Sequence, residues 1–86
     1  MNIVDELTGL LAKQGVEIRT VSLGGGGGGL CRIKGKYTFF VDSDAATAET
    51  AGLCAEAVLR LVDIESVYMK PEVREFVEKY GRSEKE

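Results

Sequence analysis

The sequence predicts a small α+β domain in which three or four strands form an antiparallel or mixed sheet, with the helices mainly on one face. Two observations lead to this fold class. Apolar residues recur at helical spacing in an N-terminal segment and in two later segments. Between the first two of these lie short stretches rich in β-branched and aromatic residues, separated by glycines and polar turn residues. The predicted order is helix, three strands, a long helix, a segment that fits a short strand, and a closing helix.

The chain has 86 residues, which is enough for one hydrophobic core. We therefore expect a single domain over residues 1–81 and a frayed polar tail over residues 82–86. A domain of this size buries only about 60% of the surface of its unfolded chain. Its stability is expected to be marginal, and association between copies is the compensation most compatible with the sequence.

The N-terminal helix is predicted to begin after Asn2, whose side chain is a good N-cap, and to end at Gly15. The first strand follows at residues 16–23. Its apolar positions change phase partway along the segment, which predicts a bulge or a strand end near Arg19 and Thr20.

The second strand is predicted at residues 30–34, with Cys31 and Ile33 directed toward the core. Gly35-Lys36 follows as a two-residue connection with glycine first, which is the pattern of a type II′ hairpin turn. The second and third strands are therefore expected to be antiparallel neighbours.

The third strand, residues 37–41, is the most apolar stretch of the chain and is predicted to lie at the centre of the sheet, covered on both sides. Phe40 is expected on the opposite face from Phe39. Asp42-Ser43-Asp44 ends this strand. Both aspartates are expected to cap the following helix, where the positive end of the helix dipole stabilises a carboxylate.

The long helix is predicted over residues 45–63, with a broad apolar stripe that packs on the sheet. Residues 64–69 are compatible with a loop or with a short edge strand. Pro71 is favourable at the first position of the closing helix, because its missing N–H costs nothing there. Gly81 ends that helix.

The formal net charge is −3, and the 11 basic residues are spread along the chain, which argues against a dedicated nucleic-acid surface. No apolar run approaches the roughly 20 residues needed to span a bilayer. The N-terminus is acidic where a signal peptide is basic, so we expect a cytoplasmic protein. Two cysteines are too few for a disulfide framework and fit a reducing compartment.

Cys31 and Cys54 are both predicted to face the core, where free cysteine behaves as a small hydrophobic residue. The alternative is that they approach one another as a redox pair. The chain has no histidine and no C-x-x-C motif, and a zinc site would need two carboxylate ligands beside the thiols. No metal site and no cofactor are therefore predicted.

A run of six consecutive glycines separates the first two strands. The run consists of Gly24, Gly25, Gly26, Gly27, Gly28 and Gly29. A phosphate-binding glycine loop normally leads into a helix, whereas this run leads into a strand and lacks the Lys-Ser/Thr pair of a P-loop. We therefore expect a flexible connection between strands. The alternatives are a loop that binds a small ligand or an anion together with Arg32 or Lys34, and a flap over a partner's surface.

The segment Phe39-Phe40-Val41-Asp42-Ser43-Asp44 resembles the strand-end D-x-D motif of haloacid-dehalogenase-type phosphatases. The resemblance implies that Asp42 is a nucleophile and Asp44 an acid/base, acting with magnesium. However, Thr47 falls one residue later than the threonine of that motif, and the chain is too short for the sheet of that family. The interpretation of both aspartates as helix caps is therefore preferred.

Four basic residues are expected to share the outer face of the sheet. They are Arg19, Arg32, Lys34 and Lys36. An exposed charged face that protects the edge strands is the preferred interpretation. The alternative is a basic patch that meets an acidic partner.

The order of elements over roughly residues 3–62 resembles the core of zincin-like domains of the ImmA/IrrE type. The resemblance places Ala55-Glu56-Ala57-Val58-Leu59 where the H-E-x-x-H zinc motif stands in that family. Only the glutamate position is kept, so the resemblance implies a zincin-like scaffold without the zinc chemistry. From the residues alone, Glu56 is an exposed residue that pairs with Arg60 one helical turn later.

No complete catalytic constellation is visible, because Asp42, Asp44 and Glu56 each have an adequate structural explanation. We therefore expect a non-catalytic protein-interaction module that associates with itself or with another protein, and not with nucleic acid or a membrane. The alternative is a regulatory domain that binds a small ligand or an anion through the Gly24–Gly29 loop.

Overall fold

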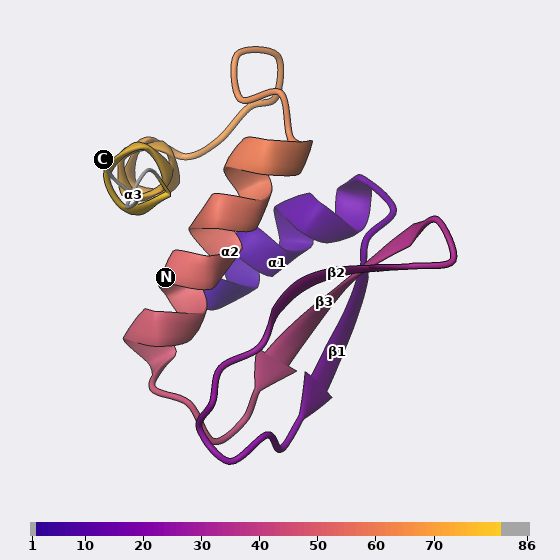
Figure 1. The fold of residues 1–86 in the computed structure, drawn as a ribbon. Coiled ribbons are helices and arrows are strands. Elements are labelled where there is room, and N and C mark those ends of the chain that lie inside the picture. The colour runs from indigo at the N-terminus through magenta and orange to yellow at the C-terminus, as the bar shows by residue number, and fades with distance from the viewer. Residues whose placement is uncertain (1, 82–86) are drawn as a thin grey trace, which may run out of the picture.

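Within residues 2–81, which the computed structural model describes, the chain forms three helices and one three-stranded sheet (Figure 1). The elements are α1 (Ile3–Lys13), β1 (Glu17–Val21), β2 (Gly29–Ile33), β3 (Lys36–Asp42), α2 (Thr47–Leu61) and α3 (Pro71–Tyr80). The α+β class and the order of these elements confirm the prediction. The tail expected at residues 82–86 lies outside the described residues.

β3 is the central strand of the sheet, as predicted. β1 pairs with it in parallel and β2 pairs with it in antiparallel orientation, so the sheet is mixed. The two parallel strands arise because β2 carries the chain back to the starting end, after which β3 inserts between β1 and β2 (Figure 1). The segment between α2 and α3 contains no strand, so the loop alternative for residues 64–69 is correct.

The hairpin turn between β2 and β3 lies one residue earlier than predicted. Ile33 pairs with Lys36, so the two turn residues are Lys34 and Gly35. Both have positive φ angles, 53° and 80°, which is the pattern of a type I′ turn and not of the predicted type II′ turn. The twist of a type I′ turn matches that of the flanking strands, and this match outweighs the cost of a left-handed φ at Lys34.

The observed register reverses the predicted faces of β2. Directly paired residues point to the same side of a sheet, and Leu30 pairs with the buried Phe39 whereas Cys31 pairs with Thr38. Leu30 therefore packs against the core, and Cys31 is exposed on the opposite face. The prediction that Cys31 and Ile33 face the core is wrong, because β2 carries apolar residues on both faces and its pattern alone does not fix its phase.

β1 pairs with β3 without interruption from Glu17 to Val21, so no bulge occurs near Arg19 and Thr20. The strand ends at Val21, one residue after Thr20, which agrees with the alternative prediction of a strand end there. The change of phase has a different cause. Ile18 packs against the core, whereas Val21 lies on the opposite face of the sheet. β1 thus contributes apolar side chains to both faces.

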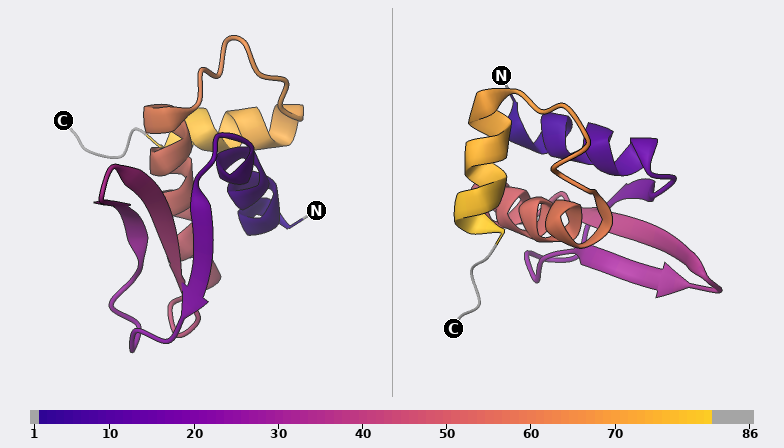
Figure 2. Two further views of the ribbon diagram at one scale, coloured as in Figure 1. Left: turned by 90° about the vertical axis from the view of Figure 1, so that its right-hand side faces the viewer. Right: turned by 90° about the horizontal axis from the view of Figure 1, so that it is seen from above.

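One face of the sheet packs against α1 and α2, and Phe39 at the centre of β3 is fully buried there. The other fully buried side chains of large volume are Leu7, Leu11, Cys54, Val58, Val73 and Val77. α3 packs against α2 and, to a smaller extent, against α1. The right-hand view of Figure 2 shows the helices on one side of the sheet.

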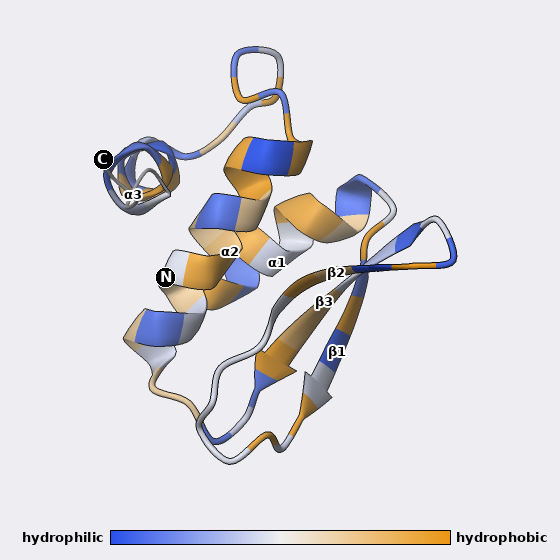
Figure 3. Cartoon of the chain, viewed as in Figure 1, coloured by the Kyte–Doolittle hydropathy of each residue, from blue (hydrophilic) through white to orange (hydrophobic). Residues whose placement is uncertain are grey.

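The opposite face of the sheet has no covering helix among the described residues, so the prediction that β3 is covered on both sides is wrong. We call this face the open face. It is formed by Glu17, Arg19 and Val21 of β1, Gly29, Cys31 and Ile33 of β2, and Lys36, Thr38 and Phe40 of β3. Figure 3 shows apolar segments along the strands as well as on the helices. Because Val21, Ile33 and Phe40 lie on the open face, the sheet has apolar residues on a face that the helices of residues 2–81 do not bury.

The ends of the helices follow the predictions at α1 and α3. The side chain of Asn2 accepts a hydrogen bond from the amide of Val4 (3.0 Å) and caps α1. Pro71 begins α3, and Gly81 follows its last residue. No helix in residues 2–81 is long and apolar enough to cross a membrane.

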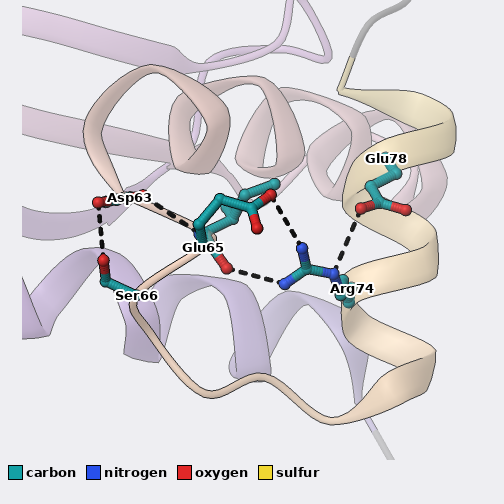
Figure 4. A network of polar contacts seen from close by, with 6 residues as sticks. Asp63, Glu65, Ser66, Arg74 and Glu78 are labelled. Carbon is teal, nitrogen blue, oxygen red and sulfur yellow. Dashed lines mark hydrogen bonds and ion pairs between the residues drawn. The ribbon is translucent and has the colours of Figure 1, made fainter.

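The connection between α2 and α3 is tied to α3 by Arg74 (Figure 4). Its guanidinium donates a hydrogen bond to the carbonyl oxygen of Ile64 (2.8 Å) and pairs with the carboxylates of Glu65 and Glu78. The carboxylate of Asp63 accepts a hydrogen bond from the amide of Glu65 (3.2 Å) at the start of the same segment. These polar contacts lie among the helices and leave the open face untouched.

Candidate functional site

The glycine loop, residues 24–29, is held by the aspartate that ends β3. The carboxylate of Asp42 accepts hydrogen bonds from the amides of Leu23, Gly27 and Asp44, each at 2.9 Å. The Oδ1 atom accepts from Leu23 and Asp44, and the Oδ2 atom accepts from Gly27. Two points of the loop region are therefore joined to the end of the central strand.

Asp44 holds the beginning of the same loop. Its carboxylate accepts hydrogen bonds from the amide of Gly24 (2.9 Å) and from the hydroxyl of Ser22. The amide of Ser43 donates to the carbonyl oxygen of Val21 at 2.8 Å. These bonds extend the contact between the ends of β1 and β3 beyond the strands themselves.

The prediction that Asp42 and Asp44 cap α2 is wrong. The helix begins at Thr47, and its N-cap residue, Ala46, makes no side-chain capping hydrogen bond. Asp42 lies opposite Val21 in the parallel ladder. This register places both carboxylates beside the loop that leaves β1, and they accept hydrogen bonds from amides of that segment.

The side chain of Asp42 is almost fully buried, with 2% of its surface exposed. Burial by itself raises the pKa of this carboxyl group. The amides of Asp44, Leu23, Gly27 and Gly25 outweigh burial and hold the pKa below the ordinary value of 3.8. Asp42 is therefore a buried carboxylate at neutral pH, and backbone N–H groups stabilise its charge.

Two features of the loop require glycine. Four of its residues have φ angles between 74° and 139°, a region that residues with a Cβ atom rarely adopt. At Gly28, a Cβ atom would lie 1.8 Å from the carbonyl oxygen of Phe40. The loop is therefore a hydrogen-bonded structure packed against β3, in contrast to the random-coil connection expected from its composition.

The residues considered for anion binding are not brought together by the fold. The amides of Gly24 and Gly27 already donate to carboxylates. The guanidinium of Arg32 lies 5.6 Å from the ring centroid of Tyr37, on the core side of the sheet. Lys34 lies in the hairpin turn, at the opposite end of β2 from the glycine loop.

The open face carries two hollows that share Phe40 as a wall, and we call them the loop hollow and the hairpin hollow. The loop hollow, of about 380 Å³, is lined by Val21, Leu23, Gly27, Gly28, Gly29, Cys31 and Phe40. The hairpin hollow, of about 390 Å³, is lined by Glu17, Arg19, Ile33, Lys34, Lys36, Thr38 and Phe40. The first is mainly apolar, and the second combines apolar and charged side chains.

The hairpin hollow is basic, although the chain as a whole carries a net charge of −3. Three cationic side chains and one carboxylate line it, which is a formal excess of two positive charges. Arg19 pairs with Glu17 at 2.7 Å, and its hydrogen bond lowers the pKa of Glu17. Lys34 and Lys36 supply the excess. Of the four basic residues predicted to share this face, Arg32 lies on the other side of the sheet.

Phe40 was identified from the sequence only as a residue on the opposite face from Phe39, and that placement is confirmed. The sequence feature that could have identified Phe40 as a surface residue of the site is the presence of an aromatic residue on each face of the central strand. Within residues 2–81, the helices cover only one face of the sheet. An aromatic residue on the second face is therefore left at the surface.

The two cysteines do not face one another, so the redox-pair interpretation is wrong, and the prediction of core packing is confirmed for Cys54 but wrong for Cys31. Cys54 on α2 is fully buried, and burial raises the pKa of its thiol to about 12. Cys31 is exposed and lines the loop hollow on the other side of the sheet. The reversed phase of β2 accounts for the difference.

Within residues 2–81, the residues named by the two motif resemblances are not arranged as those motifs would require. Both carboxylate oxygens of Asp42, the nucleophile of the phosphatase resemblance, accept amide hydrogen bonds. Ala55 and Leu59, at the zinc-ligand positions of the zincin resemblance, lie on α2, and Ala55 is fully buried. Across residues 2–81, no group of three or more Cys, Asp or Glu side chains is arranged to hold a metal ion.

Comparison with known proteins found no family model that matches the chain, no similar curated protein and no similar solved structure. The zincin-like resemblance therefore stays a prediction. Any inference about function therefore rests on the side chains and backbone contacts of the glycine loop and of the open face.

Proposed function

We propose that this protein is a non-catalytic interaction module that binds another polypeptide through the open face of its sheet. The main observation that supports this proposal is the position of Phe40. Its partly exposed ring lies on the central strand of the open face, which no helix of residues 2–81 covers, and it forms a wall of both hollows. Strands normally bury their apolar face against another layer, and a contiguous apolar surface that is left open is typical of a binding site.

Two further apolar side chains extend the surface on either side of Phe40. Leu23 is 48% exposed and lines the loop hollow, and Ile33 is 49% exposed and lines the hairpin hollow. Single exposed apolar residues are ordinary. These residues form a strip from the loop to the hairpin, because both hollows meet at Phe40.

The chemistry around the hollows favours binding over catalysis. Asp42 and Asp44, the strongest candidates for acid/base work, already accept hydrogen bonds that hold the glycine loop. Glu17, the carboxylate that lines the hairpin hollow, is paired with Arg19. These carboxylates therefore already have hydrogen-bond or ion-pair partners within the chain, which supports a structural role for them in stabilising the open face.

The same contacts weigh against the loop as an anion-binding site, because amides that would face an anion already face carboxylates. We also propose that the protein acts in the cytoplasm. Cys31 and Cys54 are free thiols, and an exposed free thiol such as that of Cys31 suits a reducing compartment.

Site-specific photo-crosslinking tests the proposed function. A photoreactive amino acid replaces Ile33 in one variant and Leu23 in another, and cells expressing each variant are irradiated. The matched control carries it at Tyr68, which is 82% exposed in the connection between α2 and α3. We expect a discrete crosslinked protein from both open-face positions and none from Tyr68. The same crosslinks from all three positions, or none from the open face, would contradict the proposal.

A further inference from the structure

We infer that the open face binds a short, extended polypeptide segment that carries carboxylates at one end and apolar side chains at the other. The carboxylates of this segment meet Lys34 and Lys36 at the hairpin hollow, and its apolar side chains enter the loop hollow. This inference rests on the proposed function, because it names the class of partner for the same surface.

The hairpin hollow presents positive charge to a ligand. Arg19, Lys34 and Lys36 line it, and all three residues are exposed. Glu17 pairs with Arg19 at 2.7 Å, and this hydrogen bond, together with the nearby charge of Lys36, lowers the pKa of Glu17. Lys34 and Lys36 form no ion pair with a carboxylate of residues 2–81. The charges of both lysines therefore remain for the carboxylates of a ligand.

The loop hollow, at the other end of the face, presents apolar surface. Its lining consists of three glycines together with Val21, Leu23, Cys31 and Phe40, and none of these residues is an Asp, Glu, Lys or Arg. The nearby amides of Gly24 and Gly27 already donate to carboxylates of the chain. A polar group buried in this hollow would lose its hydrogen bonds to water, whereas an apolar side chain loses none. The loop hollow therefore favours an apolar side chain.

β3 sets the distance between the two ends of the ligand. Lys36 and Phe40 lie on the same face of this strand, about 13 Å apart at about 3.3 Å per residue. In an extended ligand, the side chains on one side recur at every second residue, so residues about four positions apart span the same distance. We therefore expect a carboxylate and an apolar side chain about four residues apart in the bound segment.

The size of the face favours a short segment over a folded domain. Three strands about 4.8 Å apart, and seven residues of β3 at about 3.3 Å each, give a face of roughly 14 by 23 Å, or about 330 Å². Folded partners normally bury about 800 Å² each. An extended segment of about seven residues covers the same length as β3. We therefore expect a dissociation constant on the order of 100 µM.

The charges of the face disfavour two other occupants. Among the residues that form the open face, Glu17 is the one carboxylate, and it is paired with Arg19. Two open faces brought together would therefore offer the lysines no free carboxylate in either face. A nucleic acid is disfavoured because the chain has a net charge of −3, which repels a polyanion, and the hairpin hollow has an excess of only two positive charges.

Fluorescence anisotropy with defined peptides tests this inference. The acidic probe is a fluorescein-labelled peptide of about nine residues with two leucines at one end, two glutamates about four residues away, serine elsewhere and both termini blocked. One matched probe carries lysine in place of glutamate, and the other carries serine in place of leucine. We expect the wild-type chain to bind the acidic probe at least about tenfold more tightly than either matched probe.

Charge reversal in the protein tests the role of the two lysines. We expect K34E/K36E to weaken binding of the acidic probe at least about tenfold and to bind the lysine probe more tightly than the acidic one. K13E/K79E makes the same change of net charge at exposed positions of α1 and α3, away from the face. Its affinity for the acidic probe should stay within about threefold of the wild-type value. Circular dichroism melts confirm that both variants keep the fold.

Each outcome decides a separate point. Equal weakening by the two double variants, equal binding of the acidic and lysine probes, or no binding of the acidic probe at about 1 mM overturns the acidic segment as ligand. Tighter binding of phosphatidylserine–phosphatidylcholine vesicles or of single-stranded DNA than of the acidic probe, lost in K34E/K36E, overturns a polypeptide as the occupant. If the acidic probe fails while Ile33 still crosslinks to a protein, the proposed function stands. If both fail, the proposed function falls as well.

Discussion

The amide of Gly27 donates a hydrogen bond to the Oδ2 atom of Asp42 at 2.9 Å, across 15 positions in the sequence. In anion-binding glycine loops, the backbone amides face a bound ligand. Here they face a carboxylate of the same chain. Gly27 also lines the loop hollow, so Asp42 fixes the shape of one end of the open face.

Replacing Asp42 by asparagine should destabilise the fold and loosen the glycine loop. Asparagine keeps one acceptor oxygen, but its NH₂ group replaces the other and leaves an amide donor without an acceptor. We expect Tm to fall by roughly 5–10 °C, with faster hydrogen exchange at the amides of Leu23 and Gly27. Circular dichroism melts and amide exchange measure these effects.

The matched control for this change is Glu75→Gln, which removes the same charge from an exposed position on α3. Its Tm should change by no more than about 2 °C. If Asp42→Asn were as stable as this control, with unchanged exchange in the loop, the carboxylate would not be what holds the loop.

The scaffold could largely be predicted because its signals are local. Asn2 precedes an apolar helical stripe, Pro71 begins α3, and the apolar pattern of β3 identifies Phe39 as a core residue. The phase of β2 could not be predicted in this way. It depends on the pairing of Leu30 with Phe39, and apolar residues occur on both faces of that strand.

The candidate site was harder to predict because it depends on contacts between distant segments. Asp42 stands just before a helix, which is the local pattern of a cap, but the amides of Leu23 and Gly27 that it binds lie 19 and 15 positions earlier. The sequence does place glycine at the loop positions that have positive φ angles. The close approach of Gly28 to Phe40 follows from the parallel pairing of β1 and β3, which no local signal indicates.

The contribution of Asp42 to stability should depend on pH. Burial raises the pKa of this carboxyl group, but the amide hydrogen bonds outweigh it, and the pKa in the folded chain lies below 3.8. A group of this kind stabilises the fold above its unfolded pKa and loses that contribution as the pH falls through its folded pKa. The difference in Tm between the wild type and Asp42→Asn should be constant from about pH 7 to 5 and shrink below about pH 4. An equal difference at pH 7 and at about pH 2.5 would contradict this origin of the stability.

Two alanine substitutions in the glycine loop should have opposite outcomes. At Gly28 the added Cβ atom would lie 1.8 Å from a backbone oxygen of the central strand, and we expect Tm to fall by at least about 5 °C. At Gly26 the nearest atom would be 3.7 Å away, so alanine fits and restricts the unfolded chain, which stabilises by about 0.4–1 kcal/mol. Equal effects in thermal melts would show that the loop is not packed against β3.

The two thiols should differ in reactivity. Cys31 is exposed, whereas burial of Cys54 raises its pKa to about 12 and leaves almost no thiolate at neutral pH. Ellman's reagent should therefore titrate one thiol rapidly in the native protein and the second after guanidinium is added. Cys31→Ser should abolish the rapid phase. Two rapid equivalents in the native wild type would contradict the burial of Cys54.

The central claim, that the open face binds another polypeptide, is tested most directly by photo-crosslinking from Ile33, which lines the hairpin hollow, with Tyr68 in the connection between α2 and α3 as the matched position away from the face. We expect a discrete crosslinked protein from Ile33 and none from Tyr68. The same crosslinks from both positions, or none from Ile33, would contradict the claim.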